Sequence, residues 1–113
     1  MVLDDRRKFE RVRIPDFARV FIAGEDQQRV GPVRLLGRGG FMVSTTQKFT
    51  VGERRSFALI DEPEGIWRRV VAVVRSVGPE GVGFEFEDLD ADAAVEVGVI
   101  IGRHYTPRAV SGR

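Results

Sequence analysis

The chain has 113 residues and a mass of 12.6 kDa, the size of one compact domain. It has no cysteine and one histidine, so disulfides, thiolate catalysis, cysteine-ligated zinc and multi-histidine metal sites are excluded. Eighteen Lys and Arg against seventeen Asp and Glu leave a net charge of +1, which argues against a general DNA- or RNA-binding role. No apolar run approaches the roughly 18 residues of a membrane span, and charged residues 4–8 interrupt any export signal. We therefore expect a cytoplasmic protein without a membrane segment.

The near-neutral total conceals an uneven distribution of charge. Residues 6–13 hold five basic residues and one acid, whereas residues 85–96 hold six acids and no base. This separation predicts an anion-binding site near the first segment and a solvated or partner-facing surface at the second.

Glycines and prolines separate short runs of β-branched and aromatic residues, a pattern typical of several strands joined by turns. The predicted strands, in chain order, are Ala18–Ala23, Arg29–Leu36, Phe41–Ser44, Ser56–Ile60, Ile66–Val77 and Val82–Glu87. Pro32 predicts an edge or a bulge within the second strand. Six such strands at this spacing predict a mainly β fold, a small six-stranded antiparallel β-barrel.

The segment Asp88–Tyr105 changes character and predicts a C-terminal helix. Asp88 or Asp90 is a suitable N-cap, and acids in the first turns complement the helix dipole. One face would carry Leu89, Ala93, Val97, Ile100 and Ile101. The second half, residues 97–102, also fits a strand, because it has two glycines and β-branched residues. We divide the chain into a basic arm (1–15), a barrel with its helix (16–105) and a flexible tail (106–113).

Two segments have residues that suit ligand chemistry. The arm contains Arg6, Arg7 and Arg11 ahead of Pro15, and guanidinium groups fork onto phosphate oxygens or onto the guanine edge. A plain solvated terminus is the alternative for this segment. The turn Gly37-Arg38-Gly39-Gly40 allows a ligand to approach the backbone, with Arg38 adding a charge, and a turn needed only by the barrel is the alternative there.

In their order and spacing these segments carry a resemblance to a known family. Arg7 to Arg11 forms an RxxxR motif with Arg6 ahead of it, and Leu35 to Gly40 aligns with a [D/N]xSxxG motif. Residues 81–86 and the acids at 88–92 match the family's last strand and helix start. The chain thus resembles the PilZ domain, the bacterial receptor module for cyclic di-GMP, over about residues 5–104.

The resemblance implies a regulatory receptor or adaptor that binds cyclic di-GMP, reorders its arm on binding and contacts a protein partner. It implies no metal, no further cofactor and no enzymatic activity. The implied ligand-binding residues are Arg6, Arg7, Arg11, Gly37, Arg38, Gly39 and Gly40. Two positions depart from the family pattern: Leu35 replaces an Asp or Asn that binds a guanine edge, and Gly37 replaces a Ser that helps to hold phosphate.

These departures favour an alternative function, a degenerate PilZ-like domain that works only as a protein–protein adaptor. The residues give no support to an enzyme, since no nucleophile with a base and no catalytic carboxylate pair stand out. Trp67 lies in a predicted strand, where packing in the core or at an edge is more common than base stacking.

Overall fold

The computed structural model describes residues 11–105. Its strands are β1 (Arg11–Arg13), β2 (Val20–Gly24), β3 (Arg29–Gly37), β4 (Gly40–Val43), β5 (Arg54–Asp61), β6 (Ile66–Gly78) and β7 (Gly81–Asp88). Short 3₁₀ turns cover Asp16–Ala18 and Glu62–Glu64, and the helix α2 spans Ala91–His104. Arg6, Arg7 and the tail 106–113 lie outside the described residues. The structure therefore does not test the predicted ligand-binding role of the two arginines or the predicted flexible tail.

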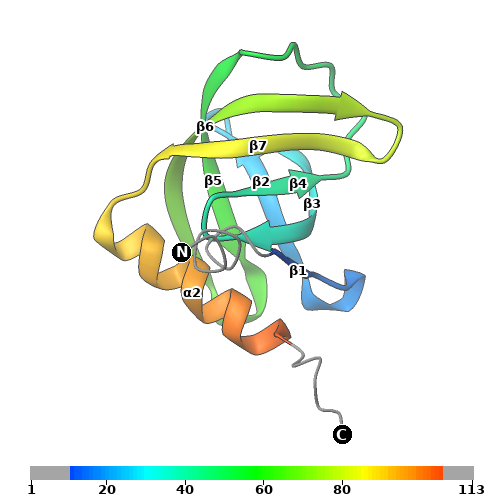
Figure 1. The fold of residues 1–113 in the computed structure, drawn as a ribbon. Helices are drawn as coiled ribbons and strands as arrows, with labels where there is room; N and C mark the ends of the chain where they lie inside the picture. The colour runs from blue at the N-terminus through cyan, green and yellow to red at the C-terminus, as the bar shows by residue number, and fades with distance from the viewer. Residues whose placement is uncertain (1–10, 106–113) are drawn as a thin grey trace, which may run out of the picture.

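Six of the strands form a closed antiparallel barrel, as predicted (Figure 1). The strand order is β3–β2–β5–β6–β7–β4, and β4 returns to pair with β3. Closure removes the exposed sheet edges that a flat six-stranded sheet of this size would leave.

β1 is an additional strand that the sequence analysis placed in the arm. It pairs with the second half of β3 in the register Arg11–Gly37, Val12–Leu36 and Arg13–Leu35, while β2 pairs with the first half of β3. Since Val12 is only 8% exposed, it joins the core, and its two arginine neighbours face outward. Part of the arm is therefore fixed to the barrel.

The predicted irregularity near Pro32 is confirmed. The register between β2 and β3 shifts at Ile22/Ala23, and that between β3 and β4 shifts at Val33/Leu35. Pro32 lacks an amide hydrogen, so a strand paired on both sides accommodates it only beside such breaks.

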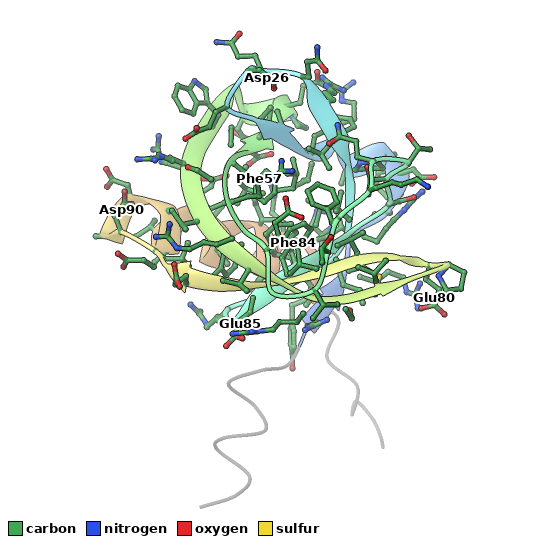
Figure 2. All side chains as sticks on the ribbon, turned by 90° about the horizontal axis from the view of Figure 1, so that it is seen from above. Asp26, Phe57, Glu80, Phe84, Glu85 and Asp90 are labelled. Carbon is green, nitrogen blue, oxygen red and sulfur yellow. The ribbon has the colours of Figure 1, made fainter. Side chains whose placement is uncertain are left out.

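Phenylalanines fill the centre of the barrel, where Figure 2 shows Phe57 and Phe84 inside the ring of strands. Phe41 stacks on Phe84 at 4.9 Å between ring centroids, and Phe57 and Phe49 meet the Phe84 ring edge-on at 5.1 and 5.3 Å. Offset stacks and edge contacts are the favoured aromatic geometries, and they add to the stabilisation from burial.

The helix α2 packs against β6, β3 and β1 across one end of the barrel (Figure 1). The Asp90 side chain caps it by accepting a 2.8 Å hydrogen bond from the Ala93 amide. Ala93, Val97 and Ile100 belong to the core cluster, and Leu89 and Ile101 pack against it, which confirms the predicted helical face. The strand alternative for residues 97–102 is wrong, because burial of Val97 and Ile100 holds that segment in the helix.

Trp67 lies at an edge rather than in the core. It is 64% exposed on the outer face of β6, in the part of that strand that pairs with β5 but not with β7. One single-residue expectation is wrong. Glu96, within the acidic stretch expected to be solvated, is only 5% exposed, because the helical period places it on the barrel side beside Val97.

Candidate ligand-binding site

The strands β1, β3 and β4 bring the two predicted motifs together. Arg11 lies opposite Gly37 in the β1–β3 register, and the β3–β4 turn follows directly with Arg38 and Gly39. The arginine that ends the RxxxR motif is therefore fixed beside the glycine turn by backbone pairing.

A small cavity of about 150 Å³ lies at this junction. Its lining residues come from β1, the β3–β4 turn, β6 and β7, and they are Arg11, Gly39, Gly40, Arg75, Ser76, Gly83, Phe84 and Glu85. Arg75 forms a 2.6 Å ion pair with Glu85, and both side chains are more than half exposed. The cavity thus combines the guanidinium of Arg11, the Arg75–Glu85 ion pair, the hydroxyl of Ser76 and glycine backbone, a set that offers hydrogen-bond donors to an anionic ligand.

The glycines of the turn also have a packing role. A Cβ on Gly40 would lie 2.1 Å from the Phe84 carbonyl oxygen, so only glycine allows β4 and β7 to approach. The Gly39 carbonyl accepts a 2.9 Å hydrogen bond from the Phe86 amide. The barrel itself therefore requires Gly40, as the alternative interpretation of this turn expected, and the same two glycines line the cavity.

The other predicted site residues that the structure describes, Gly37 and Arg38, do not line the cavity. Gly37 is buried opposite Arg11. Arg38 does not line the cavity: its guanidinium lies against α2, with a nitrogen 3.5 Å from the place a Cβ on Gly98 would occupy. Among the predicted residues that the structure describes, Arg11, Gly39 and Gly40 are the ones brought to the cavity.

Leu35 occupies the outward-facing row next to the cavity. Its register partners are Arg13 on β1 and Met42 on β4, and it is half-buried while Leu36 points into the core. The position therefore contributes an apolar surface where the [D/N]xSxxG motif begins with a hydrogen-bonding side chain.

Sequence reasoning missed Arg75 and Ser76. They lie in the long strand β6, where nothing in the local pattern separates Arg75 from the other arginines. Only the β6–β7 pairing, which places Ser76 opposite Gly83, brings them to the glycine turn.

A buried carboxylate pair lies elsewhere, between β5 and α2. Asp61 is fully buried and receives a 2.8 Å hydrogen bond from Arg103, while its Oδ1 and the Glu96 Oε2 have no hydrogen-bond partner. Burial and the neighbouring Asp61 raise the pKa of Glu96 to about 7. Burial and the neighbouring Arg103 lower the pKa of His104. The described residues contain no cluster of three or more side chains able to hold a metal ion.

A second concave surface lies on the outer faces of β2, β5 and β6. It encloses about 680 Å³, with exposed Trp67 on one side and the small side chains of Ala23 and Ala58 among its lining residues. At its border the Arg29 guanidinium lies 3.9 Å from the centre of the Phe21 ring.

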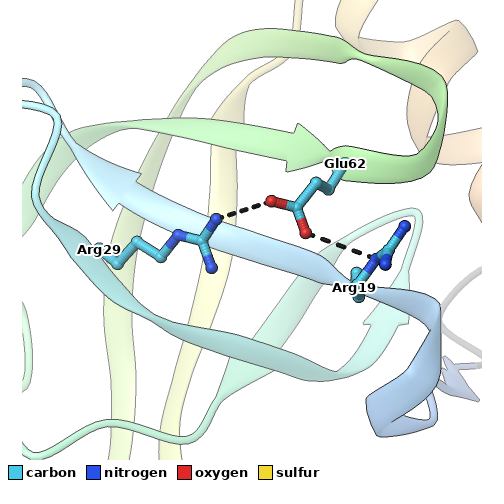
Figure 3. Close-up of polar contacts among 3 residues, drawn as sticks. All are labelled: Arg19, Arg29 and Glu62. Carbon is cyan, nitrogen blue, oxygen red and sulfur yellow. Dashed lines mark hydrogen bonds and ion pairs between the residues drawn. The ribbon is translucent and has the colours of Figure 1, made fainter.

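One carboxylate bridges two arginines beside this surface (Figure 3). Glu62 accepts a 2.9 Å hydrogen bond from Arg29 and lies 3.5 Å from Arg19. The Trp67 surface is therefore largely apolar, and the arginines at its border form ion pairs.

Comparison with known proteins assigns the family. The PilZ domain model matches residues 5–101, which is most of the chain and includes both motifs and all six barrel strands. No curated protein matches the chain. Within the described residues, no helix is long and apolar enough to cross a membrane. The barrel, its capping helix and this match together show that the chain belongs to the PilZ domain family, a family of cyclic di-GMP receptor domains.

Proposed function

We propose that this protein is a cytoplasmic regulatory receptor that binds cyclic di-GMP at the junction of β1 with the β3–β4 turn. The observation that carries the proposal is the meeting of Arg11 with Gly39 and Gly40 in one cavity. Two motifs more than twenty residues apart in sequence thereby line one surface, which a purely structural role for the arm does not require.

The residues suit the ligand's chemistry. Arg11 would fork onto a phosphate or onto the O6/N7 edge of guanine, and Arg75 supplies a second guanidinium that the sequence alone did not indicate. Gly39 and Gly40 let the ligand reach the backbone. By the RxxxR motif, Arg7 joins Arg11 on the ligand and Arg6 assists, so binding would reorder the arm over the barrel. The altered surface would then be read by a protein partner, without catalysis, metal or further cofactor.

The test is calorimetric titration of the protein with cyclic di-GMP, comparing Arg11→Ala with Arg69→Ala. Arg69 is an exposed β6 arginine outside the cavity, so it controls for the loss of one positive charge. We expect a Kd below about 10 µM for the wild type and for Arg69→Ala, and a loss of at least about tenfold for Arg11→Ala. Equal affinities for the two variants would contradict the proposed site.

A second candidate function is a protein–protein adaptor without the ligand. Leu35 favours it, because a half-buried leucine replaces the polar group that begins the second motif. The exposed Trp67 surface also provides apolar area that a partner would cover. A flat titration up to high micromolar cyclic di-GMP, with circular dichroism showing an intact barrel, would favour this function over the first.

A further inference from the structure

The outer face of β2, β5 and β6 steps from bulky to small side chains between two neighbouring rows of residues. Strand pairing defines the bulky row, with one residue from each strand: Phe21, Ile60 and Trp67. It defines the next outward row in the same way: Ala23, Ala58 and Arg69. The concavity of about 680 Å³ lies at the foot of this step, with the two alanines and Trp67 among its lining residues. One face therefore has a raised row and a hollow beside it.

The two ends of the bulky row differ in how the chain covers them. At one end the Arg29 guanidinium lies 3.9 Å from the centre of the Phe21 ring, and Glu62 pairs with that guanidinium at 2.9 Å (Figure 3). At the other end Trp67 is 64% exposed. Tryptophan is enriched among the few side chains that supply most of the binding energy at protein interfaces. Trp67 is thus an anchor that the described residues leave largely uncovered.

The charges at the border of the concavity balance each other. Arg69 and Glu25 lie 3.4 Å apart with 67% and 65% of their side chains exposed, and Arg29 is paired with Glu62. Exposed ion pairs contribute little to stability, so they exchange partners at little cost. A border with equal numbers of acids and bases does not repel a copy of itself, and it offers no excess charge to a strongly acidic or basic partner.

We propose that two copies of this protein associate through this face about a two-fold axis, with Trp67 of each copy entering the concavity of the other. A two-fold interface uses the same patch on both copies, so the patch must supply both the protrusion and the hollow, and this one does. A concavity of about 680 Å³ is large enough for a drug-sized molecule and so has room for an indole ring. The partner that covers the Trp67 surface is then a second copy of the chain rather than a foreign protein.

Sedimentation velocity between about 1 and 500 µM protein tests the association. We expect a monomer–dimer equilibrium with a micromolar Kd, because an apolar patch on three strands is small for a protein interface. Trp67 is the only tryptophan of the chain, so its fluorescence emission should shift to longer wavelength on dilution, as the indole returns to water. A protein that stays monomeric over this range would overturn the proposal.

Two variants locate the interface. Trp67→Ala should weaken the dimer at least about tenfold, whereas Phe17→Ala should leave it unchanged. Phe17 is an aromatic residue that is 83% exposed in the 3₁₀ turn Asp16–Ala18, outside this face, so it controls for the loss of an exposed ring. Circular dichroism checks that each variant keeps the barrel. A folded Trp67→Ala protein that dimerises like the wild type would overturn the proposal.

A mixing experiment tests the reciprocal contact. Ala58→Gln fills the concavity and keeps Trp67, so it should also weaken the dimer. An equimolar mixture of Trp67→Ala and Ala58→Gln should associate more tightly than either variant alone, because the mixed dimer regains one of the two Trp67 contacts. A mixture that associates no better than the single variants would overturn the two-fold arrangement.

The proposal goes beyond the receptor function and does not rest on it, because the concavity and the cavity at Arg11 share no lining residue. Trp67→Ala should therefore bind cyclic di-GMP with wild-type affinity, and Arg11→Ala should dimerise like the wild type. A Trp67-dependent dimer of a protein that does not bind cyclic di-GMP would support this proposal and reject the receptor function. Ligand binding that depends on Arg11 in a protein that stays monomeric would do the reverse.

Discussion

Leu35 lies in the outward-facing row between Arg13 and Met42, two residues along β3 from Gly37. The leucine side chain stands where the motif has an Asp or Asn, and it cannot form a hydrogen bond. A ligand base placed over it would lose one buried polar contact and keep only van der Waals contact.

Leu35→Asp should therefore tighten cyclic di-GMP binding by about tenfold, because a charge-assisted hydrogen bond is worth about 1.5–3 kcal/mol. Calorimetry of Leu35→Asp beside Leu35→Ala measures the effect. Leu35→Ala removes the same side chain without adding a carboxylate, so it controls for lost packing. Unchanged or weaker binding by Leu35→Asp would reject the alignment of this position with the motif.

Glu96 illustrates a different residue-scale effect, on stability. The raised pKa means that the folded protein keeps the Glu96 proton up to about pH 7, whereas the unfolded chain releases it near the ordinary value of 4.5. The folded state therefore binds more protons between these pH values, and this group's contribution to stability falls as the pH rises from 4.5 to 7.

Glu96→Gln should stabilise the protein above pH 7, by up to about 3 kcal/mol, and have little effect near pH 4.5. The neutral amide offers a hydrogen-bond donor to Asp61, whose Oδ1 has no partner, without adding a second buried negative charge. Urea unfolding at several pH values measures the difference, with Glu80→Gln on the exposed β6–β7 hairpin as the control. A stability difference between wild type and Glu96→Gln that does not change with pH would contradict this account.

At the scale of elements, Gly40 in β4 and Gly102 in α2 affect stability in opposite ways. In β4, a Cβ on Gly40 would collide with the β7 backbone, whereas a Cβ on Gly102 in α2 would meet nothing within 4 Å. One glycine is thus demanded by strand pairing, and the other weakens a helix that has room for a side chain.

The same substitution at both sites should have opposite effects. Gly40→Ala should destabilise the barrel by more than about 2 kcal/mol through backbone displacement, and Gly102→Ala should stabilise the protein by up to about 1 kcal/mol through helix propensity. Thermal unfolding of the two variants provides the measurement. A Gly40→Ala protein as stable as the wild type would show that β4 and β7 can separate without loss.

Most strands and the helix were predictable from the sequence. The missed strand β1 and the undecided second half of α2 have physical causes. Periodicity identified the six barrel strands and the helical face, since each buries one side of a long segment. β1 was missed because it has three residues, two of them arginines, and its formation depends on pairing with β3 rather than on its own composition. The continuation of α2 through Gly98 was open for the same reason, because tertiary packing decides it.

For the whole molecule, the site was predictable only where a sequence motif points to it. The motifs indicated Arg11, Gly39 and Gly40, which the fold brings together, but local sequence gave no sign that Arg38 lies against α2. Nor did it indicate Arg75, because the position of this residue depends on the distant strand that pairs with β6.

The proposed reordering of the arm predicts a change in proteolysis. Saturating cyclic di-GMP should slow tryptic cleavage after Arg6, Arg7 and Lys8 severalfold, because a segment held against the barrel fits a protease poorly. Mass spectrometry of the cleavage products follows the rate, and Arg11→Ala should show no protection. Equal cleavage rates with and without bound ligand would mean that binding leaves the arm as it was.

The pairing of Arg103 with Asp61 sets where this domain ends. The family match stops at residue 101, two positions before the guanidinium that compensates a fully buried carboxylate on β5. A chain cut at residue 101 would keep the barrel strands and most of α2 but leave Asp61 as an uncompensated charge in the interior, a defect worth about 3–5 kcal/mol. The smallest piece that keeps this ion pair therefore extends past the family boundary, through Arg103.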